Sequence, residues 1–81
     1  MNIYKIEEYL NDDSKATTKT RICVSEQGFK SSLKAAKRSV NQHNANIAYL
    51  EDEDIPLPVP YTRMDYRVFE TTALDWREWK E

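Results

Sequence analysis

The feature that most restricts the fold of this chain is a narrow apolar stripe with helical spacing. Four apolar side chains fall within an arc of ~60° on a helical projection: Phe29, Leu33, Ala36 and Val40. Because the stripe is narrow, it covers one surface only, which is typical of a single helix lying on a sheet. We expect this helix to begin near Ser31 or Ser32, whose hydroxyls cap free amide groups, and to end at residues 43–46 (HNAN).

Segments with strand character lie on both sides of this helix. Residues 3–10 are rich in Ile, Tyr and Leu, and residues 18–25 alternate between two faces. The turn-forming cluster between them predicts an antiparallel pair. After the helix, residues 47–51 and 64–71 are the third and fourth predicted strands. The sequence therefore predicts an α+β fold, an antiparallel sheet of four to five strands with one α-helix packed on it, in β-β-α-β-β order.

Two further segments complete what we read as a single domain, residues 1–81. The segment EDEDIPLPVPYTR is predicted to be a long loop, because proline cannot donate to a strand ladder. The end of the chain, ALDWREWKE, is predicted to form either a short last strand or a helical turn. For the core, we expect Leu33, Ala36 and Val40 to contact Ile22, Val24, Ile47 or Val68.

Composition argues against several classes of protein. Hydrophobic residues make up 40% of the chain and aromatic residues 11%, which is typical of a folded chain and not of a disordered one. Its apolar runs are too short to span a bilayer, and the first ten residues lack the pattern of a signal peptide. The single cysteine, Cys23, has no internal disulfide partner, so we expect a reducing, cytosolic setting.

Neither catalysis nor metal binding is indicated by the pattern. Nucleophilic catalysis usually places a His base against Ser or Cys. Here Cys23 lies in a predicted strand, where a small buried residue is usual, and His43 lies at the predicted helix end, where capping or solvent exposure is usual. The acidic run at residues 51–54 lacks the alternate ligands and glycine turn of a calcium loop. We therefore expect no enzyme activity, no cofactor and no metal.

Charge is divided unevenly along the chain. The net charge is −2, yet residues 1–46 carry +3 and residues 47–81 carry −5. The segment from Gln27 to Asn46 contains four basic residues and no acidic residue. On the predicted helix these four occupy an arc of ~100°, about a third of a turn from the apolar one: Lys30, Lys34, Lys37 and Arg38. We call these four residues the basic stripe.

The basic stripe has two interpretations. Most surface helices carry a solvated charged face, but such faces usually mix signs and often place Glu four residues before Lys. An unmixed basic stripe is instead the electrostatic signature of binding to phosphate or to an acidic protein surface. The overall acidity of the chain, with an isoelectric point near 5.4, argues against a general nucleic-acid binder.

A second set of candidate contacts lies in the acidic half of the chain. It consists of Glu51, Asp52, Glu53, Asp54 and Trp79. Trp76 and Trp79 share a face if they lie on a helix and point to opposite faces if they lie on a strand. Tryptophan side chains in small domains more often close the core than bind a partner. We therefore expect one of the two tryptophans to close the core and the other to be available to a partner.

The helix segment SLKAAKRSV resembles the S-L-x-x-A-K-R-x-A segment of small phage-encoded anti-CRISPR proteins that inhibit the type I-F surveillance complex. The likeness extends to YKIEE, TRI and IAYLE, in the same order, and leaves out the proline-containing loop and the WREW end. It implies a compact antiparallel sheet with one helix, no catalysis, and binding that stops target DNA from pairing with the guide. Of the basic stripe, only Lys37 and Arg38 match positions of that family.

We therefore expect a small non-enzymatic, phage-derived inhibitor that acts in the host cytoplasm. Its partner would be a bacterial protein or a guide-RNA–protein complex, with any nucleic-acid contact secondary and no membrane involved. The alternative is a nucleic-acid-binding or regulatory module that uses the same helix against phosphate. The target, the host and the oligomeric state are left open by the sequence.

Overall fold

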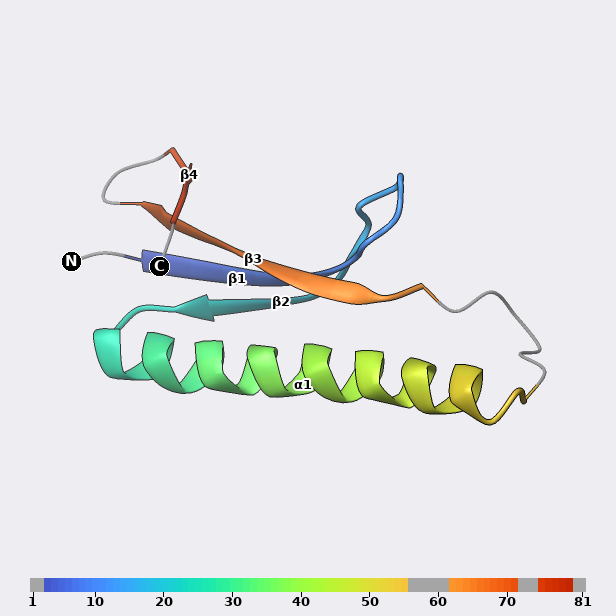
Figure 1. Ribbon diagram of the computed structural model, residues 1–81. Coiled ribbons are helices and arrows are strands. Elements are labelled where there is room, and N and C mark those ends of the chain that lie inside the picture. Colours follow the sequence, from blue (N-terminus) through green and yellow to red (C-terminus); the bar gives the residue numbers. More distant parts are fainter. Residues whose placement is uncertain (1–2, 56–61, 72–74, 80–81) are drawn as a thin grey trace.

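The computed structural model describes residues 3–55, 62–71 and 75–79, and across these it places one helix on one face of a four-stranded antiparallel sheet (Figure 1). The elements are β1 (Ile3–Leu10), β2 (Thr17–Cys23), α1 (Glu26–Asp52), β3 (Met64–Thr71) and β4 (Arg77–Glu78). Their order across the sheet is β2-β1-β3-β4. The α+β fold and the β-β-α-β-β order predicted from the sequence are confirmed.

The first two strands form a hairpin with a tight, polar turn. Asp12 accepts hydrogen bonds from the backbone N–H of Ser14 at 2.9 Å and of Lys15 at 3.3 Å. Lys15 has a positive φ of 49°, which the turn requires. A bulge interrupts the ladder after Glu8, beyond which Tyr9 lies opposite Thr17. The predicted antiparallel pair is therefore present, with its second strand starting at Thr17.

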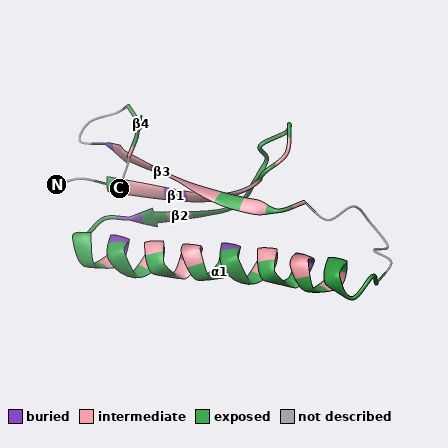
Figure 2. Ribbon diagram, viewed as in Figure 1, coloured by how far each residue is buried: buried purple, intermediate pink, exposed green. Residues whose placement is uncertain are grey.

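The helix covers the sheet face that carries Ile6, the most deeply buried large side chain of the described residues. Ile6 lies opposite Arg21 on one side and Val68 on the other, so it occupies the centre of the sheet. The buried positions of α1 lie on the side of the helix that faces the sheet (Figure 2). Ile6 and Val68 form the sheet side of the core, together with Cys23, and Phe29 and Ala36 form its helix side.

The predicted inward face of β2 is wrong. Ile22 and Val24, the residue just after β2, are 58% and 59% exposed, whereas Cys23 between them is buried. Cys23 lies opposite Tyr4, which is on the face that α1 covers, and alternation therefore sends Ile22 to the other face. Cys23 is the last residue of β2, and the helix begins three residues later. The side chain of Cys23 therefore lies on the sheet face that the helix covers.

The helix is longer than predicted and starts earlier. It begins after Ser25, whose hydroxyl accepts a hydrogen bond from the Gly28 N–H at 3.0 Å, so Ser31 and Ser32 are interior residues and not caps. Gly28 fits this cap closely, since a Cβ there would lie 2.9 Å from the Ser25 Oγ. Gly28 therefore belongs to the first helical turn.

The predicted third strand at residues 47–51 is also wrong, because α1 continues through it to Asp52. Ile47 is 2% exposed and extends the buried helical series of Phe29, Ala36 and Val40 by a spacing of seven. The polar segment HNAN does not end the helix, since two of its side chains bind the chain before and at the start of β3. His43 Nε2 lies 2.9 Å from the Thr62 carbonyl oxygen, and the Asn44 side chain bonds both backbone groups of Met64.

The last strand, β4, is short, and the two tryptophans that flank it lie on opposite sides of the sheet, as predicted for a strand. Trp79 packs edge-on against Phe29 with ring centroids 5.1 Å apart, and Tyr4 stacks on Phe29 at 4.1 Å. Trp76 lies over the opposite face, where the Lys5 ammonium is 4.6 Å from its ring centroid. Trp79 therefore helps to close the core, and Trp76 is the more exposed of the two.

Within the described residues, no helix has the length and apolar character needed to cross a membrane. Pro56, Pro58 and Pro60 of the predicted long loop lie outside the described residues. Residues 51 and 52 of the predicted acidic loop are the last helical residues, and 53 and 54 form a turn.

Candidate partner-binding surface

The structure places the basic stripe in the first half of α1, and one of its members, Lys37, lies near β3. Lys30, Lys34 and Arg38 are exposed and follow one another at intervals of four residues, which is one helical turn. Lys37 is half-buried and lies beside them. The four residues are therefore brought together as the helical projection predicted, but they are not equally open to solvent.

The charge of Lys30 is partly offset by Glu26. Its ammonium lies 3.7 Å from the Glu26 carboxylate, four residues earlier, and both side chains are more than two-thirds exposed. An exposed pair of this kind contributes about 0–1 kcal/mol and weakens with salt. Lys30 therefore keeps much of its positive potential toward solvent.

Lys37 points toward the sheet. Its ammonium lies 6.0 Å from the centroid of the Tyr66 ring on β3, at the outer range of a cation–π contact. Asn44, two turns further along the helix, reaches the start of the same strand. Lys37 thus links the basic stripe to the edge of β3, and its side chain contributes to helix–sheet packing as well as to surface charge.

Like charges at one-turn spacing are unfavourable for the helix itself. Lys30–Lys34 and Lys34–Arg38 are both i,i+4 pairs of equal sign, and each such pair destabilises a helix by about 0.2–0.5 kcal/mol. Apart from Glu26, no acidic residue of α1 lies within four positions of the stripe. Helix stability therefore does not explain this arrangement.

The acidic candidates gather at the other end of the helix. Glu51 and Asp52 lie in its last turn, Glu53 is the C-cap and Asp54 follows with a positive φ of 52°. All four are exposed, and the last turn has no basic residue, so they oppose the helix dipole. Only Glu51 has an ion pair among the described residues, with Arg63 at 3.1 Å. Arg38 and Glu51 are separated by about 20 Å along the helix axis.

Trp79, the remaining predicted contact, lies apart from this acidic group. Its ring packs on Phe29, and its backbone N–H donates to the Val68 carbonyl oxygen at 2.7 Å. The five secondary candidates therefore form no common surface. The exposed tryptophan is Trp76, at 39%.

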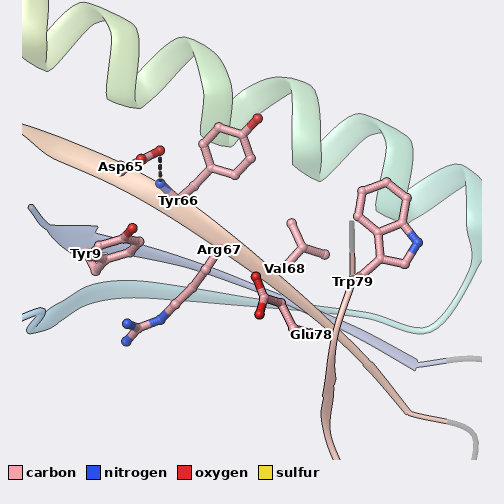
Figure 3. A pocket seen from close by; sticks show the side chains of 7 residues that line it. All are labelled: Tyr9, Asp65, Tyr66, Arg67, Val68, Glu78 and Trp79. Atoms are coloured by element: carbon pink, nitrogen blue, oxygen red, sulfur yellow. Dashed lines mark hydrogen bonds between the residues drawn. The ribbon is translucent and has the colours of Figure 1, made fainter. Parts of the chain in front are cut away.

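A shallow groove that sequence reasoning missed runs along the outer edge of β3 (Figure 3). Its volume is about 400 Å³, and its lining residues are Tyr9, Asp65, Tyr66, Arg67, Val68, Glu78 and Trp79. Tyr66 and Trp79 project toward α1, whereas Arg67 projects away from it (Figure 3). The groove exists because β4 pairs with only Phe69 and Glu70 of β3.

The sheet face opposite the helix carries a compact charge network. Arg67 Nε donates to Glu7 Oε1 at 2.8 Å, and its second nitrogen Nη2 donates to the Thr17 hydroxyl at 2.8 Å. The Arg67 guanidinium also lies 4.6 Å from the Tyr9 ring centroid. These contacts join β1, β2 and β3, so we assign them to the stability of the sheet.

The surroundings of Cys23 and His43 are those of residues that stabilise the fold. Cys23 is buried in the core, and His43 is engaged with the Thr62 carbonyl oxygen, so the two are not brought together as a nucleophile and its base. Among the residues that the structure describes, no group of three or more His, Cys, Asp or Glu side chains is arranged to hold a metal ion.

Comparison with protein-family models, with curated proteins and with solved structures finds no match for this chain.

Proposed function

We propose that this chain is a small non-enzymatic binding protein that docks the basic stripe of α1 onto an acidic macromolecular surface. The observation that carries the proposal is the series Lys30, Lys34 and Arg38, in which like charges repeat at one-turn spacing on an exposed helix face. Such a series weakens the helix in isolation and becomes favourable only when a negatively charged partner lies against it.

The resemblance of SLKAAKRSV to anti-CRISPR helices gives the proposal a specific form. The partner is a bacterial CRISPR effector nucleoprotein complex in the host cytoplasm, and binding keeps target DNA from pairing with the guide. The helix-on-sheet fold is the one that the resemblance implied. Basic residues of the helix would then occupy or border the path of the DNA, and the acidic end of α1 would face basic protein surface.

The test is a charge reversal that spares the core. Lys34→Glu together with Arg38→Glu changes two exposed side chains, so the fold should persist and partner binding should be lost. Lys37 is left unchanged, because its half-buried side chain contacts Tyr66. A matched control, Lys15→Glu with Arg77→Glu, changes the net charge equally at two exposed positions outside the stripe.

The two variants and the parent are compared in capture of partners from bacterial lysate and in DNA binding by a purified type I-F effector complex. We expect the parent and the control to inhibit and the stripe variant to fail, while circular dichroism shows that all three proteins are folded. Inhibition by the stripe variant at the parent level would refute the role of the stripe.

Phosphate binding by the same helix is the second outcome of this test. If free duplex or single-stranded DNA binds the parent with a log–log salt slope of about one per phosphate contact, the chain acts on nucleic acid directly. The acidic end of α1, with Glu51, Asp52 and Glu53 exposed, disfavours a duplex laid along the whole helix. We therefore expect no measurable slope for free DNA.

A further inference from the structure

The two sides of the sheet differ in how far their strand edges are covered by other parts of the chain. At the β3 edge, β4 pairs with Phe69 and Glu70, and Trp79 donates to the Val68 carbonyl oxygen. Further along, the Asn44 amide donates to the Met64 carbonyl at 2.9 Å and accepts from its N–H at 2.8 Å. This side chain occupies the place of a neighbouring strand. Proteins commonly cover sheet edges in such ways to prevent unwanted pairing.

The β2 edge has no such cover among the described residues. Because Trp79 reaches Val68 from outside the sheet, the backbone groups of Val68 point away from β1. Alternation then directs the groups of the opposing Ile6 toward Arg21, as a hydrogen-bonded pair. The neighbours of Arg21, Thr20 and Ile22, consequently direct their N–H and C=O groups outward. No described segment pairs with them, since β2 is the terminal strand of the sheet.

The side chains along this edge alternate between two chemical characters. Thr20 and Ile22 are exposed on the face away from the helix. Lys19 and Arg21 lie on the helix side, opposite Glu8 and Ile6. Lys19 is exposed and has no ion pair among the described residues. Arg21 uses Nε and Nη2 on the Glu8 carboxylate, both at 3.4 Å, which leaves Nη1 without a described partner.

We propose that the edge of β2 is a strand-addition site for an extended segment of a partner protein with acidic side chains at alternate positions. Backbone bonds at Thr20 and Ile22 would add the segment to the sheet, and its acidic side chains would meet Lys19 and Arg21. The helix beside this edge presents no acidic residue between Gln27 and Asn46, so it does not repel such a segment.

A second copy of the chain fits this edge poorly. Antiparallel pairing of two β2 strands about Thr20 sets Lys19 of one copy opposite Arg21 of the other, and like charges directly opposite each other are destabilising. Lysine on an exposed edge strand is itself a known device against self-pairing. The site lies on a different element from the basic stripe, so this proposal does not depend on the function proposed above.

The probe is an acetylated, amidated octapeptide of alternating glutamate and threonine, with the lysine–threonine octapeptide as its charge-reversed counterpart. In amide-resolved NMR of the full chain, the acidic peptide should shift the Thr20 and Ile22 N–H signals and slow their hydrogen exchange. We expect the basic peptide to bind at least about tenfold more weakly. The variant with Lys34→Glu and Arg38→Glu should bind the acidic peptide at this edge, which separates this test from that of the basic stripe.

Proline substitution isolates the backbone contribution. Thr20→Pro removes an outward N–H and leaves the inward pair of Arg21 and Ile6 in place, so the fold should persist and peptide binding should fall at least about tenfold. Thr20→Ala, which keeps the N–H, should bind like the parent. Lys19→Glu supplies a second variant with no backbone change, and it should weaken the acidic peptide and favour the basic one.

Four outcomes would overturn the proposal. They are shifts confined to α1 or to the opposite sheet face, equal binding of the two peptides, no binding at all, and Thr20 and Ile22 amides that are already protected in the free protein. Sedimentation equilibrium adds a fifth, a dimer that Thr20→Pro dissociates, which would assign the edge to a second copy.

Discussion

Replacing Lys34 by glutamate should make the protein more stable while weakening its proposed function. Lys34 is exposed and lies one turn from Lys30 and one turn from Arg38. In the parent both contacts are repulsive, and each destabilises the helix by about 0.2–0.5 kcal/mol. In Lys34→Glu both become attractive, so each contact changes by about 0.4–1 kcal/mol.

The expected net gain is about 1 kcal/mol, below the full sum. The contact between Lys30 and the introduced glutamate has the less favourable orientation, with lysine on the N-terminal side, and exposed pairs are weakened by salt. For a domain of this size, a change of about 1 kcal/mol corresponds to a rise in melting temperature of about 4–8 °C. Position 34 lies more than two turns from either helix end, so the helix dipole contributes little.

The assay is equilibrium unfolding in urea, evaluated by linear extrapolation at low and at high salt. Lys34→Gln is the matched control, since it removes the repulsion without adding attraction and should give about half of the gain. The gain of Lys34→Glu should shrink as salt increases. If Lys34→Glu is no more stable than the parent at low salt, the stripe is not electrostatically strained, and the central argument for a charged partner fails.

Two further predictions concern the contact between α1 and the start of β3 and the turn between β1 and β2. Asn44→Ala should lower the free energy of unfolding by about 1–3 kcal/mol, because it removes two hydrogen bonds to Met64. The control Asn41→Ala, at an exposed helix position, should be neutral or slightly stabilising. Equal urea midpoints for the two variants would contradict this prediction. Hydrogen bonds from the Ser14 hydroxyl and from the Ser14 and Lys15 amides hold the pKa of Asp12 below its usual value. The turn between β1 and β2 should therefore persist at pH values above this lowered pKa and loosen as the pH falls through it. NMR titration of the Ser14 amide measures the midpoint, which Ser14→Ala should raise; an unchanged midpoint would show that the hydroxyl is not the cause.

The strands with alternating or β-branched composition could be predicted from the sequence because their local pattern agrees with their final environment. Residues 3–10 and 64–71 became β1 and β3 with the same bounds. The error at residues 47–51 has a different origin. Ile47 belongs to the helical series of Phe29, Ala36 and Val40, but the intervening polar residues, including His43 and Asn44, gave no local reason for the helix to continue. Their partners, Thr62 and Met64, are distant in sequence.

The inward face of β2 could not be obtained from hydrophobicity alone. Ile22 and Val24 are the more apolar set, yet Cys23 is the buried residue. Register with β1 decides the face, because Cys23 opposes Tyr4 beneath the helix. The basic stripe was largely predictable, since helical spacing depends only on residue number. What the sequence could not give was the inward turn of Lys37 toward Tyr66, which depends on a strand that follows after the whole helix.

The neighbours of β1 in the sheet have a consequence for synthesis of the protein. β2 is local to β1, whereas β3, its other neighbour, follows after the whole helix, and the Arg67–Glu7 pair joins residues 60 positions apart. The ribosome releases a chain from its N-terminus, so the hairpin and the helix emerge while one flank of β1 still lacks its partner. Closing so long a segment is slow compared with forming a hairpin. The nascent chain therefore reaches its native sheet only after β3 has emerged, and until then β1 presents an unpaired flank to chaperones and to other chains.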